Sequence, residues 1–340
     1  MPPFVHTPDF ETSTLSEMRK LYEAIKPKSF FGCYAYATQS GFRSFDLAFG
    51  SEFWKETASR WLFGIDYGRT DPRAIREILN QHNTDVRIFD GEWVVAQTDF
   101  LPRRDFHAKA AILSDGVAKA KGIVLGSGNF SWSGLIKNVE AGAVLQEKTK
   151  NNKNTLNQFE EQFNKYWQLS TPAADILELY EDRFTDKKVY SRKNKPKVPK
   201  RGGRPFWIEA GYVTKNRGTD KPGNQIFFPK GFRSYFGFSN DADVEKNAII
   251  GEVNFVTAVG QPVTNNLRLN RNSMEKISLP MPETHGFGVY DGKVLVFQPD
   301  NGAFLMSALE WSDFESVFGD RLINVESMSG GRRYGEIRDE

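Results

Sequence analysis

The sequence predicts two folded domains: an α/β domain whose mixed sheet is flanked by helices, and then an all-β domain. Its 340 residues exceed the length of roughly 250 at which one hydrophobic core usually gives way to two. Short apolar runs alternate with helical stretches up to Phe184, whereas only apolar runs and turns follow from Phe206. A basic segment rich in Pro and Gly separates the halves. We therefore expect domains at 1–186 and 206–340, joined by a linker at 187–205.

The elements of the first domain follow in chain order. Apolar runs at 30–37 (FFGCYAYA) and 61–67 predict buried strands. Asp71 and Pro72 predict the start of a helix over 73–82, because an Asp side chain accepts the free amides of a first turn and Pro suits that turn. Further strands are expected at 86–89, 109–113 and 122–125, and further helices at 155–167 and 172–184. Strands separated by helices indicate a mixed α/β sheet.

The segment between the domains is strongly basic. Residues 187–204 contain nine Lys and Arg and no Asp or Glu, together with Pro196, Pro199 and the pair Gly202 and Gly203. Pro and Gly oppose a packed helix, so the segment is either a solvated connector or a basic strap beside a polyanion. A strap would gain affinity because each phosphate neutralised by Lys or Arg releases counterions.

The second domain is predicted from short strands and turns. Strands are expected at 206–213, 224–228, 248–257, 286–290 and 293–298. Between the last two, Asp291 and Gly292 predict a hairpin turn. This pattern indicates a mostly antiparallel barrel or sandwich.

Composition excludes several classes of protein. With 39% hydrophobic and 26% charged residues the chain is folded rather than disordered. The single Cys33 excludes an internal disulfide, and the four His show no metal-binding spacing, so we expect no metal site. The sequence lacks both an N-terminal charged and apolar leader and a run of about 18 apolar residues. We expect a cytoplasmic protein that does not enter a membrane.

The strongest chemical motif is 106–113 (FHAKAAIL), followed by a glycine turn at 126–131 (GSGNFS). Residues two apart on a strand face the same way, so His107 and Lys109 are expected to project together. An imidazole can attack phosphorus or protonate a leaving oxygen, and a neighbouring ammonium stabilises charge on the other oxygens. The turn adds amides, a hydroxyl and a carboxamide for the same anion. Together these groups predict a phosphate site.

This pattern, H-x-K followed about twenty residues later by G-S-x-N, resembles the signature of the phospholipase D superfamily. The resemblance implies a metal-free reaction in which His107 is a nucleophile that forms a covalent phosphohistidine. It also implies that Lys109 and Asn129 hold the phosphate, and that Ser127 is the Ser of the family's glycine turn. Glu140, in the segment NVEAG, resembles a family Glu that orients or charges an active-site partner.

The chain departs from that family pattern in two ways. The family Asp would fall on Ser114, whereas this chain has Asp115 one place later, so no role is carried over to Asp115. None of the other three histidines is followed by Lys two residues on, so only one signature is present. Because the chemistry needs one imidazole to attack and another to act as acid, the resemblance implies a homodimer that pairs two copies of His107.

The second domain is expected to read DNA sequence. Arg pairs with guanine, and Asn or Gln with adenine, and these residues are dense at 214–225 (TKNRGTDKPGNQ) and 264–273 (TNNLRLNRNS), although both could be plain solvated loops. The domain order, the strand pattern and the run IFFPK at 226–230 resemble restriction endonucleases of the BfiI and NgoFVII type. There a B-three-like pseudobarrel follows the nuclease domain. The resemblance implies DNA contacts by Lys215, Arg217, Asn224, Gln225, Arg268, Asn270, Arg271 and Asn272.

The sequence therefore predicts a metal-independent, sequence-specific restriction endonuclease that cuts double-stranded DNA. It lacks a G-x-x-x-x-G-K-[ST] loop, so ATP would act only through a separate helicase-like ATPase subunit. The resemblance also implies a companion DNA methyltransferase. Two alternatives stay open: a phosphodiesterase of the same superfamily acting on RNA or phospholipid, and a DNA-binding module whose nuclease half is inert.

Overall fold

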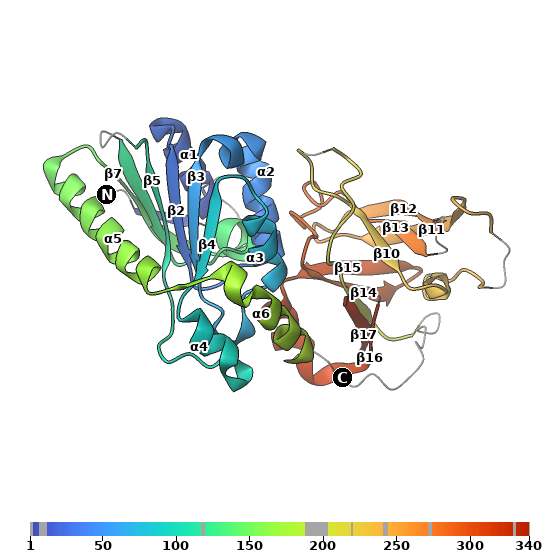
Figure 1. The fold of residues 1–340 in the computed structure, drawn as a ribbon. Helices are drawn as coiled ribbons and strands as arrows, with labels where there is room; N and C mark the ends of the chain where they lie inside the picture. The colour runs from blue at the N-terminus through green and yellow to red at the C-terminus, as the bar shows by residue number, and fades with distance from the viewer. Residues whose placement is uncertain are drawn as a thin grey trace. The chain divides into compact units, whose positions relative to one another are not determined.

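The computed structural model describes residues 3–6, 12–116, 120–187, 203–218, 220–240, 244–270, 274–328 and 331–339, with the backbone alone at 3–6 and 185–187. The chain divides into two compact units, Met1–Lys188 and Val189–Glu340 (Figure 1). Most of the basic segment at 187–204 lies outside the described residues. No described helix is both long enough and apolar enough to cross a membrane.

An eight-stranded mixed sheet forms the centre of the first unit, in the order β1-β7-β6-β5-β2-β3-β4-β8 (Figure 1). The pairs β2–β3 and β3–β4 are parallel, and the other neighbours are antiparallel. The strands are Pro3–His6 (β1), Ser29–Tyr34 (β2), Ala58–Phe63 (β3), Thr84–Ile88 (β4), Lys109–Ser114 (β5), Lys121–Gly126 (β6), Glu140–Gln146 (β7) and Thr171–Pro172 (β8). The predicted mixed α/β sheet is confirmed.

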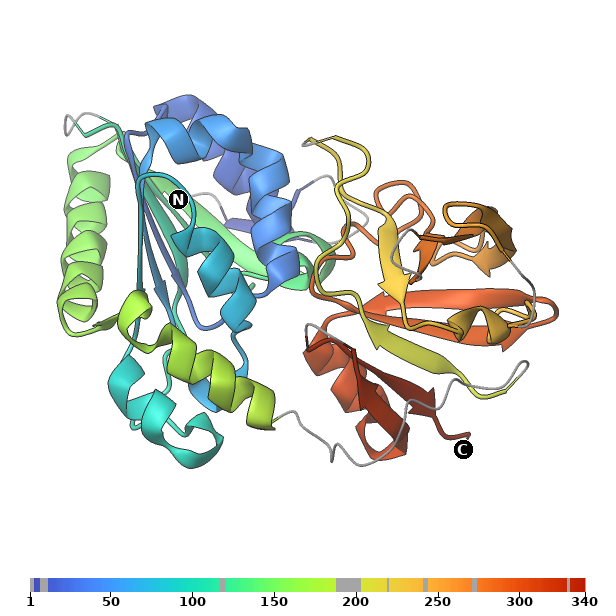
Figure 2. The same ribbon diagram turned by 45° about the vertical axis from the view of Figure 1, so that its right-hand side comes forward.

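Helices cover both faces of this sheet (Figures 1 and 2). They are Thr14–Ile25 (α1), Gln39–Glu56 (α2), Pro72–Leu79 (α3), Gly91–Ala96 (α4), Lys150–Gln168 (α5) and Ala173–Lys187 (α6), with short helices Asp66–Gly68 (η1), Thr98–Phe100 (η2) and Ser133–Lys137 (η3). Side chains alternate along each strand, so Phe30 packs in the core with α1, α2, α3 and α6. Phe31 faces the other way and packs against Trp167 of α5.

The predicted helix after Asp71 is confirmed, because the Asp71 carboxylate accepts the Arg73 amide at 2.9 Å and α3 begins at Pro72. The predicted strand at 61–67 is too long. It ends at Phe63, because Tyr67 and Gly68 have positive φ angles of 59° and 67° and belong to the short helix η1. The sequence did not predict α1, α2, α4, β1, β7 or β8.

The second unit is built on a nine-stranded sheet in the order β10-β13-β12-β11-β15-β14-β9-β17-β16. Only β11 and β15 are parallel among its neighbouring strands, so the predicted mostly antiparallel strand pairing is confirmed. The prediction of an all-β domain is wrong, because residues 311–318 form an α-helix. Its elements are Phe206–Glu209 (β9), Gln225–Phe228 (β10), Phe232–Ser234 (η4), Ile249–Val256 (β11), Pro262–Leu269 (β12), Glu275–Ser278 (β13), Val294–Asp300 (β14), Ala303–Leu309 (β15), Trp311–Phe318 (α7), Gly319–Arg321 (η5), Leu322–Ser327 (β16) and Arg333–Ile337 (β17).

The predicted strand at 286–290, and with it the predicted hairpin, is wrong. The amides of Phe287 and Gly288 both donate to the Pro282 carbonyl, so the chain curls back on itself. Gly286 and Gly288 have φ angles of 80° and 67°, which an extended strand does not allow. The alternating apolar residues of this segment face the core from a loop.

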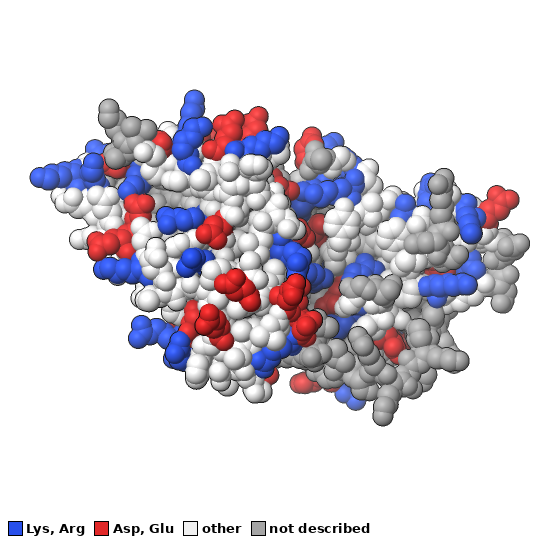
Figure 3. Space-filling model, in the orientation of Figure 1, with Lys and Arg blue, Asp and Glu red and all other residues white. Residues whose placement is uncertain are grey.

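Aromatic side chains fill the core of the second unit. Phe206, Phe228, Phe232 and Tyr235 pack together on one face of its sheet. A smaller cluster around Trp207 packs under α7. On the face of the first unit seen in Figure 3, basic and acidic side chains are interspersed, in keeping with the nearly balanced charge of residues 1–186.

Candidate active site

Three strand ends meet at one edge of the first sheet. Lys109 is the first residue of β5, Gly126 is the last residue of β6, and Glu140 is the first residue of β7. In the antiparallel ladders Ala110 faces Leu125, and Gly126 faces Gly142. The structure therefore gathers the segments that carry the five predicted site residues, His107, Lys109, Ser127, Asn129 and Glu140, at the same end of neighbouring strands.

His107 and Lys109 are in direct contact. Lys109 Nζ lies 3.1 Å from His107 Nδ1 and donates to the His107 carbonyl at 3.1 Å. His107 is exposed and precedes β5 rather than belonging to it, so the strand alternation expected from sequence does not hold the pair together. Burial lowers the pKa of the half-buried Lys109, while the negative charge of Glu140 acts in the opposite direction.

Ser127 couples the glycine turn to Glu140. Its hydroxyl donates to Glu140 Oε2 and accepts the Ala141 amide at 3.0 Å, and its own amide donates to the Ala141 carbonyl at 2.9 Å. The hydroxyl proton is thus engaged by the carboxylate rather than left for an anion. Ser127 therefore fixes Glu140 at the start of β7, where its charge acts on Lys109.

The turn that carries Asn129 is held by close backbone packing. A Cβ on Gly128 would lie 2.1 Å from the Gly134 carbonyl oxygen, and one on Gly41 would lie 2.1 Å from the Phe130 carbonyl oxygen. The Phe130 carbonyl also accepts the Thr38 amide at 2.9 Å. Within this packing, Asn129 Oδ1 is buried and has no hydrogen-bond partner among the described residues. Among the described residues, the fold therefore does not use the carboxamide oxygen of Asn129 as a hydrogen-bond acceptor.

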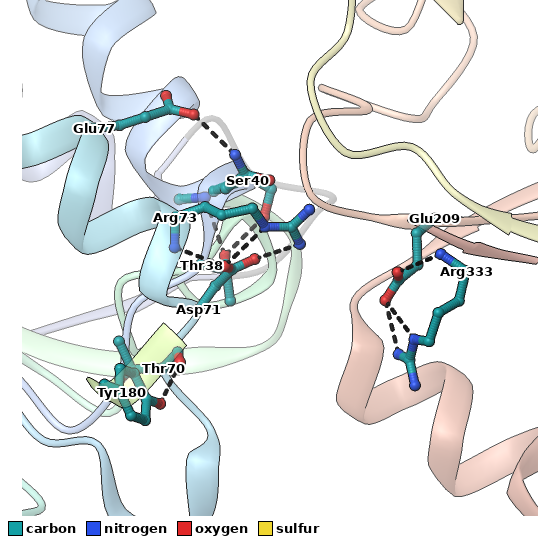
Figure 4. Close-up of polar contacts among 11 residues, drawn as sticks. Thr38, Ser40, Thr70, Asp71, Arg73, Glu77, Tyr180, Glu209 and Arg333 are labelled. Atoms are coloured by element: carbon teal, nitrogen blue, oxygen red, sulfur yellow. Dashed lines mark hydrogen bonds and ion pairs between the residues drawn. The ribbon is translucent and has the colours of Figure 1, made fainter. Parts of the chain in front are cut away.

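Polar side chains around the starts of α2 and α3 are hydrogen-bonded to neighbouring residues (Figure 4), and this region contacts the Asn129 turn at Phe130. Ala37 forms a bridge with Phe130, and the Ala37 carbonyl accepts the Asp71 amide at 2.9 Å. Asp71 is in turn held by Arg73, whose Nη2 lies 2.8 Å from Asp71 Oδ2. Tyr180 of α6 donates to the Thr70 carbonyl at 2.6 Å. These contacts make the support of Asn129 part of the packed core.

Two residues that sequence reasoning missed hold the segment before His107. The buried Asp66 accepts the Phe106 amide at Oδ2, at 2.8 Å, and the neighbouring Tyr67 hydroxyl donates to Asp105 Oδ1 at 2.9 Å. Burial raises the pKa of Asp66 to about 6, and the hydrogen bond from Phe106 opposes that shift. These contacts join segments about 40 residues apart, and no local motif signals them.

In the second unit three of the predicted DNA-binding residues, Arg217, Asn224 and Gln225, make side-chain contacts within the fold, whereas Lys215 is exposed. Arg217 Nη1 lies 2.9 Å from Glu283 Oε2, an ion pair that lowers the pKa of Glu283, and Asn224 Nδ2 donates to the Leu279 carbonyl at 2.7 Å. Gln225, on β10, donates weakly to Ser278 Oγ at 3.3 Å. Lys215 is exposed, Arg268 lies on β12, and Asn270 follows that strand. Arg271 and Asn272 lie outside the described residues.

The described residues contain no group of three or more His, Cys, Asp or Glu side chains placed to hold a metal ion. Asp115 follows β5 at the opposite end of that strand from Lys109, so the structure does not bring it to the site.

Comparison with known proteins gives distant structural likenesses. No family model matches the sequence, and no curated protein sequence matches it. NucT from Helicobacter pylori is 15% identical, covers 50% of this chain and 98% of its own, and has a TM-score of 0.37. Nuc from Salmonella typhimurium, a phospholipase D family member, is 15% identical over 50% of this chain and 97% of its own, with a TM-score of 0.35. A mutant of yeast tyrosyl-DNA phosphodiesterase is 13% identical over 44% of this chain and 33% of its own, with a TM-score of 0.26. At this level of likeness, the activity of these proteins does not transfer to this chain.

Proposed function

We propose that the protein is a phosphodiesterase that cleaves double-stranded DNA through a covalent phosphohistidine on His107. The observation that carries the proposal is the contact of His107 with Lys109. Glu140, which Ser127 holds, and the turn that carries Asn129 lie at the same edge of the sheet. A nucleophile, a cation, an amide donor and an orienting carboxylate are the groups that phosphoryl transfer requires. The H-x-K and G-S-x-N spacing supports the same chemistry.

In the proposed reaction, the lone pair of His107 Nε2 attacks phosphorus and forms an N–P bond. The bond from phosphorus to the leaving oxygen breaks, and a second, protonated imidazole gives that oxygen its proton. Water then attacks the phosphohistidine and loses a proton to the second imidazole, which is now neutral, and the N–P bond breaks. Lys109 and Asn129 stabilise the charge on the non-bridging oxygens in both steps. The imidazoles supply both nucleophile and acid, so no metal enters the scheme.

The contact between Lys109 and His107 has to change when substrate binds. A neutral His107 that attacks through Nε2 carries its proton on Nδ1, and an ammonium cannot accept a hydrogen bond from that proton. The two groups are 3.1 Å apart in the free protein. We therefore infer that Lys109 turns from Nδ1 to a phosphate oxygen as the substrate enters, which leaves Nδ1–H free for another acceptor.

The second imidazole is proposed to be His107 of a second copy in a homodimer. Within one chain, His6 is the residue that faces Glu140 in the β1–β7 ladder, so it is the matched histidine for a control. Wild-type and His107→Ala protein, mixed in equal amounts and allowed to exchange, should retain about one quarter of the wild-type rate, because one dimer in four is intact. A rate of about one half would contradict a shared site, and loss of activity in His6→Ala would place the acid in the same chain.

The second unit is proposed to be a B-three-like reader of DNA sequence, which makes the protein a restriction endonuclease. Its mostly antiparallel sheet supports this proposal, as do the exposed Lys215 and the position of Arg268 on β12. In the free protein Arg217 and Asn224 are held within the fold, so Arg217 would have to leave Glu283 to reach a base. A separate ATPase subunit and a companion methyltransferase are the proposed partners.

The test is digestion of phage DNA by the purified protein in EDTA, with the ends mapped by sequencing. Discrete ends, absent with His107→Ala, would support a nuclease that reads sequence without metal. Random ends would show that the second unit does not select the cleavage site. Cleavage of RNA or of a phosphatidylcholine vesicle, without cleavage of DNA, would show that DNA is not the substrate. If the protein cleaves no substrate with or without the proposed ATPase subunit and ATP, the nuclease half is inert.

A further inference from the structure

The segment that carries His107 has little support of its own. His107 is exposed and lies outside β5, which begins only at Lys109. Its position therefore depends on what holds the residues before it. Phe106 is buried against Phe89 and anchors one side of this segment, with the two rings stacked at 4.9 Å.

Two adjacent side chains of the short helix η1 hold two adjacent residues of this segment. Asp66 Oδ2 accepts the Phe106 amide at 2.8 Å, and the Tyr67 hydroxyl donates to Asp105 Oδ1 at 2.9 Å. The η1 turn is itself irregular, because Tyr67 has a φ of 59°. The left-handed conformation is unfavourable for a non-glycine residue and persists only where its surroundings impose it.

We propose that Asp66 is a positioning residue for His107, which it holds by fixing the peptide between Asp105 and Phe106, with Tyr67 as a second clamp on the same segment. The inference rests on the proposed function, in which the imidazole must meet phosphorus along a defined line. A misplacement of about 1 Å in such a site costs roughly a hundredfold in rate, so one backbone hydrogen bond just before the nucleophile has a large effect.

The surroundings of the Asp66 carboxylate argue against a role in packing alone. Asp66 is 8% exposed, and its Oδ1 has no hydrogen-bond partner among the described residues. Burial raises the pKa of this carboxyl to about 6, and the nearby negative charges of Asp105 and Asp90 act in the same direction. A buried carboxylate with an unpaired oxygen destabilises a fold, and such groups gather at functional sites.

The experiment compares four variants with wild type: Asp66→Ala, Asp66→Asn, Tyr67→Phe and, as a matched control, Asp85→Ala, which removes an exposed carboxylate of β4. Two signals are followed. The first is the His107 Hε1 resonance, assigned by its loss in His107→Ala. The second is the single-turnover rate of nicking of supercoiled plasmid in EDTA at saturating protein, with plasmid binding measured separately.

Asp66→Ala should shift and broaden the His107 resonance while the His82 and His285 resonances stay in place. It should lower the nicking rate at least tenfold with binding unchanged, because it acts on geometry rather than affinity. Asp66→Asn keeps an acceptor oxygen and should restore the rate to within about threefold of wild type. Tyr67→Phe removes only an exposed hydroxyl and should give a smaller shift in the same direction, even if Asp66→Ala fails to fold.

The inference is overturned if the His107 resonance is unchanged in both Asp66→Ala and Tyr67→Phe, or if Asp66→Asn is as slow as Asp66→Ala. Failure of the proposed function gives a different result. Wild-type protein would then not nick plasmid at all, while the histidine resonances would still show whether Asp66 positions His107.

Discussion

Replacing Gly128 with Ala should disable the glycine turn. A Cβ at this position would lie 2.1 Å from the Gly134 carbonyl oxygen, and real Cβ atoms essentially never come within 3.0 Å of a heavy atom elsewhere in the chain. The two segments must therefore separate by about 1 Å. Overpacking of this kind costs about 1–3 kcal/mol, and a shift of about 1 Å at Asn129 should lower the cleavage rate roughly a hundredfold.

The matched control is Gly126→Ala, two residues earlier at the end of β6. Its nearest contact for a Cβ is the Ala141 carbonyl oxygen at 3.7 Å, an ordinary van der Waals distance. Its free energy of unfolding, measured in urea, should stay within about 0.5 kcal/mol of wild type. Unfolding of Gly128→Ala at the same urea concentration as Gly126→Ala would contradict close packing of Gly128 against Gly134.

Three further predictions concern charge. Asp66 has a folded pKa of about 6 against an ordinary value of 3.8, so stability present below pH 3.8 is lost as the pH rises to about 6, by about 3 kcal/mol. Asp66→Asn lacks this loss, so its free energy of unfolding in urea should rise relative to that of wild type between pH 4 and pH 7. A difference that stays constant over this range contradicts a raised pKa of Asp66. Because burial lowers the Lys109 pKa from its ordinary value of 10.5, the nicking rate should begin to decrease at a pH below 10.5, where the ammonium loses its proton. Any residual activity of Lys109→Arg should not show this decrease. Glu283→Gln releases Arg217, so in fluorescence anisotropy this variant should bind duplex DNA several-fold more tightly than wild type at about 50 mM salt, but not at about 300 mM. If the variant and wild type bind equally at both salt concentrations, Arg217 does not contact DNA.

Local signals in the sequence predicted the elements that they describe. Asp71 and Pro72 give the start of α3, and the two apolar runs that follow His107 give β5 and β6 within a residue. The motif spacing also selected the residues that the sheet brings to one edge. These features depend on neighbours in the chain, so they can be read from it.

What the sequence did not reveal depends on tertiary packing. The helix α2 contains Gly41 and Gly50, and Gly50 has a φ of 70°, so intrinsic propensity does not favour it. It forms because Phe45 and Phe53 are fully buried against the sheet. The contact of Asp66 with the Phe106 amide likewise depends on the packing of η1 and leaves no local pattern.

At 286–290 the sequence predicted a strand that the structure does not form. Its alternation of Phe287, Val289 and polar or small residues is typical of a strand, and the apolar side chains are indeed buried. The backbone that buries them turns at Gly286 and Gly288. Alternation therefore identified which side chains face the core, whereas the glycines determined the backbone conformation.

The most direct test of the central claim is to trap the covalent intermediate. Protein is mixed with plasmid in EDTA, quenched with denaturant at alkaline pH where phosphohistidine survives, treated with nuclease and protease, and analysed by mass spectrometry. A covalent phosphohistidine on His107 predicts a nucleotide joined to the peptide that contains this residue, and no adduct with His107→Ala. Cleavage with no adduct, or an adduct on another residue, would contradict it.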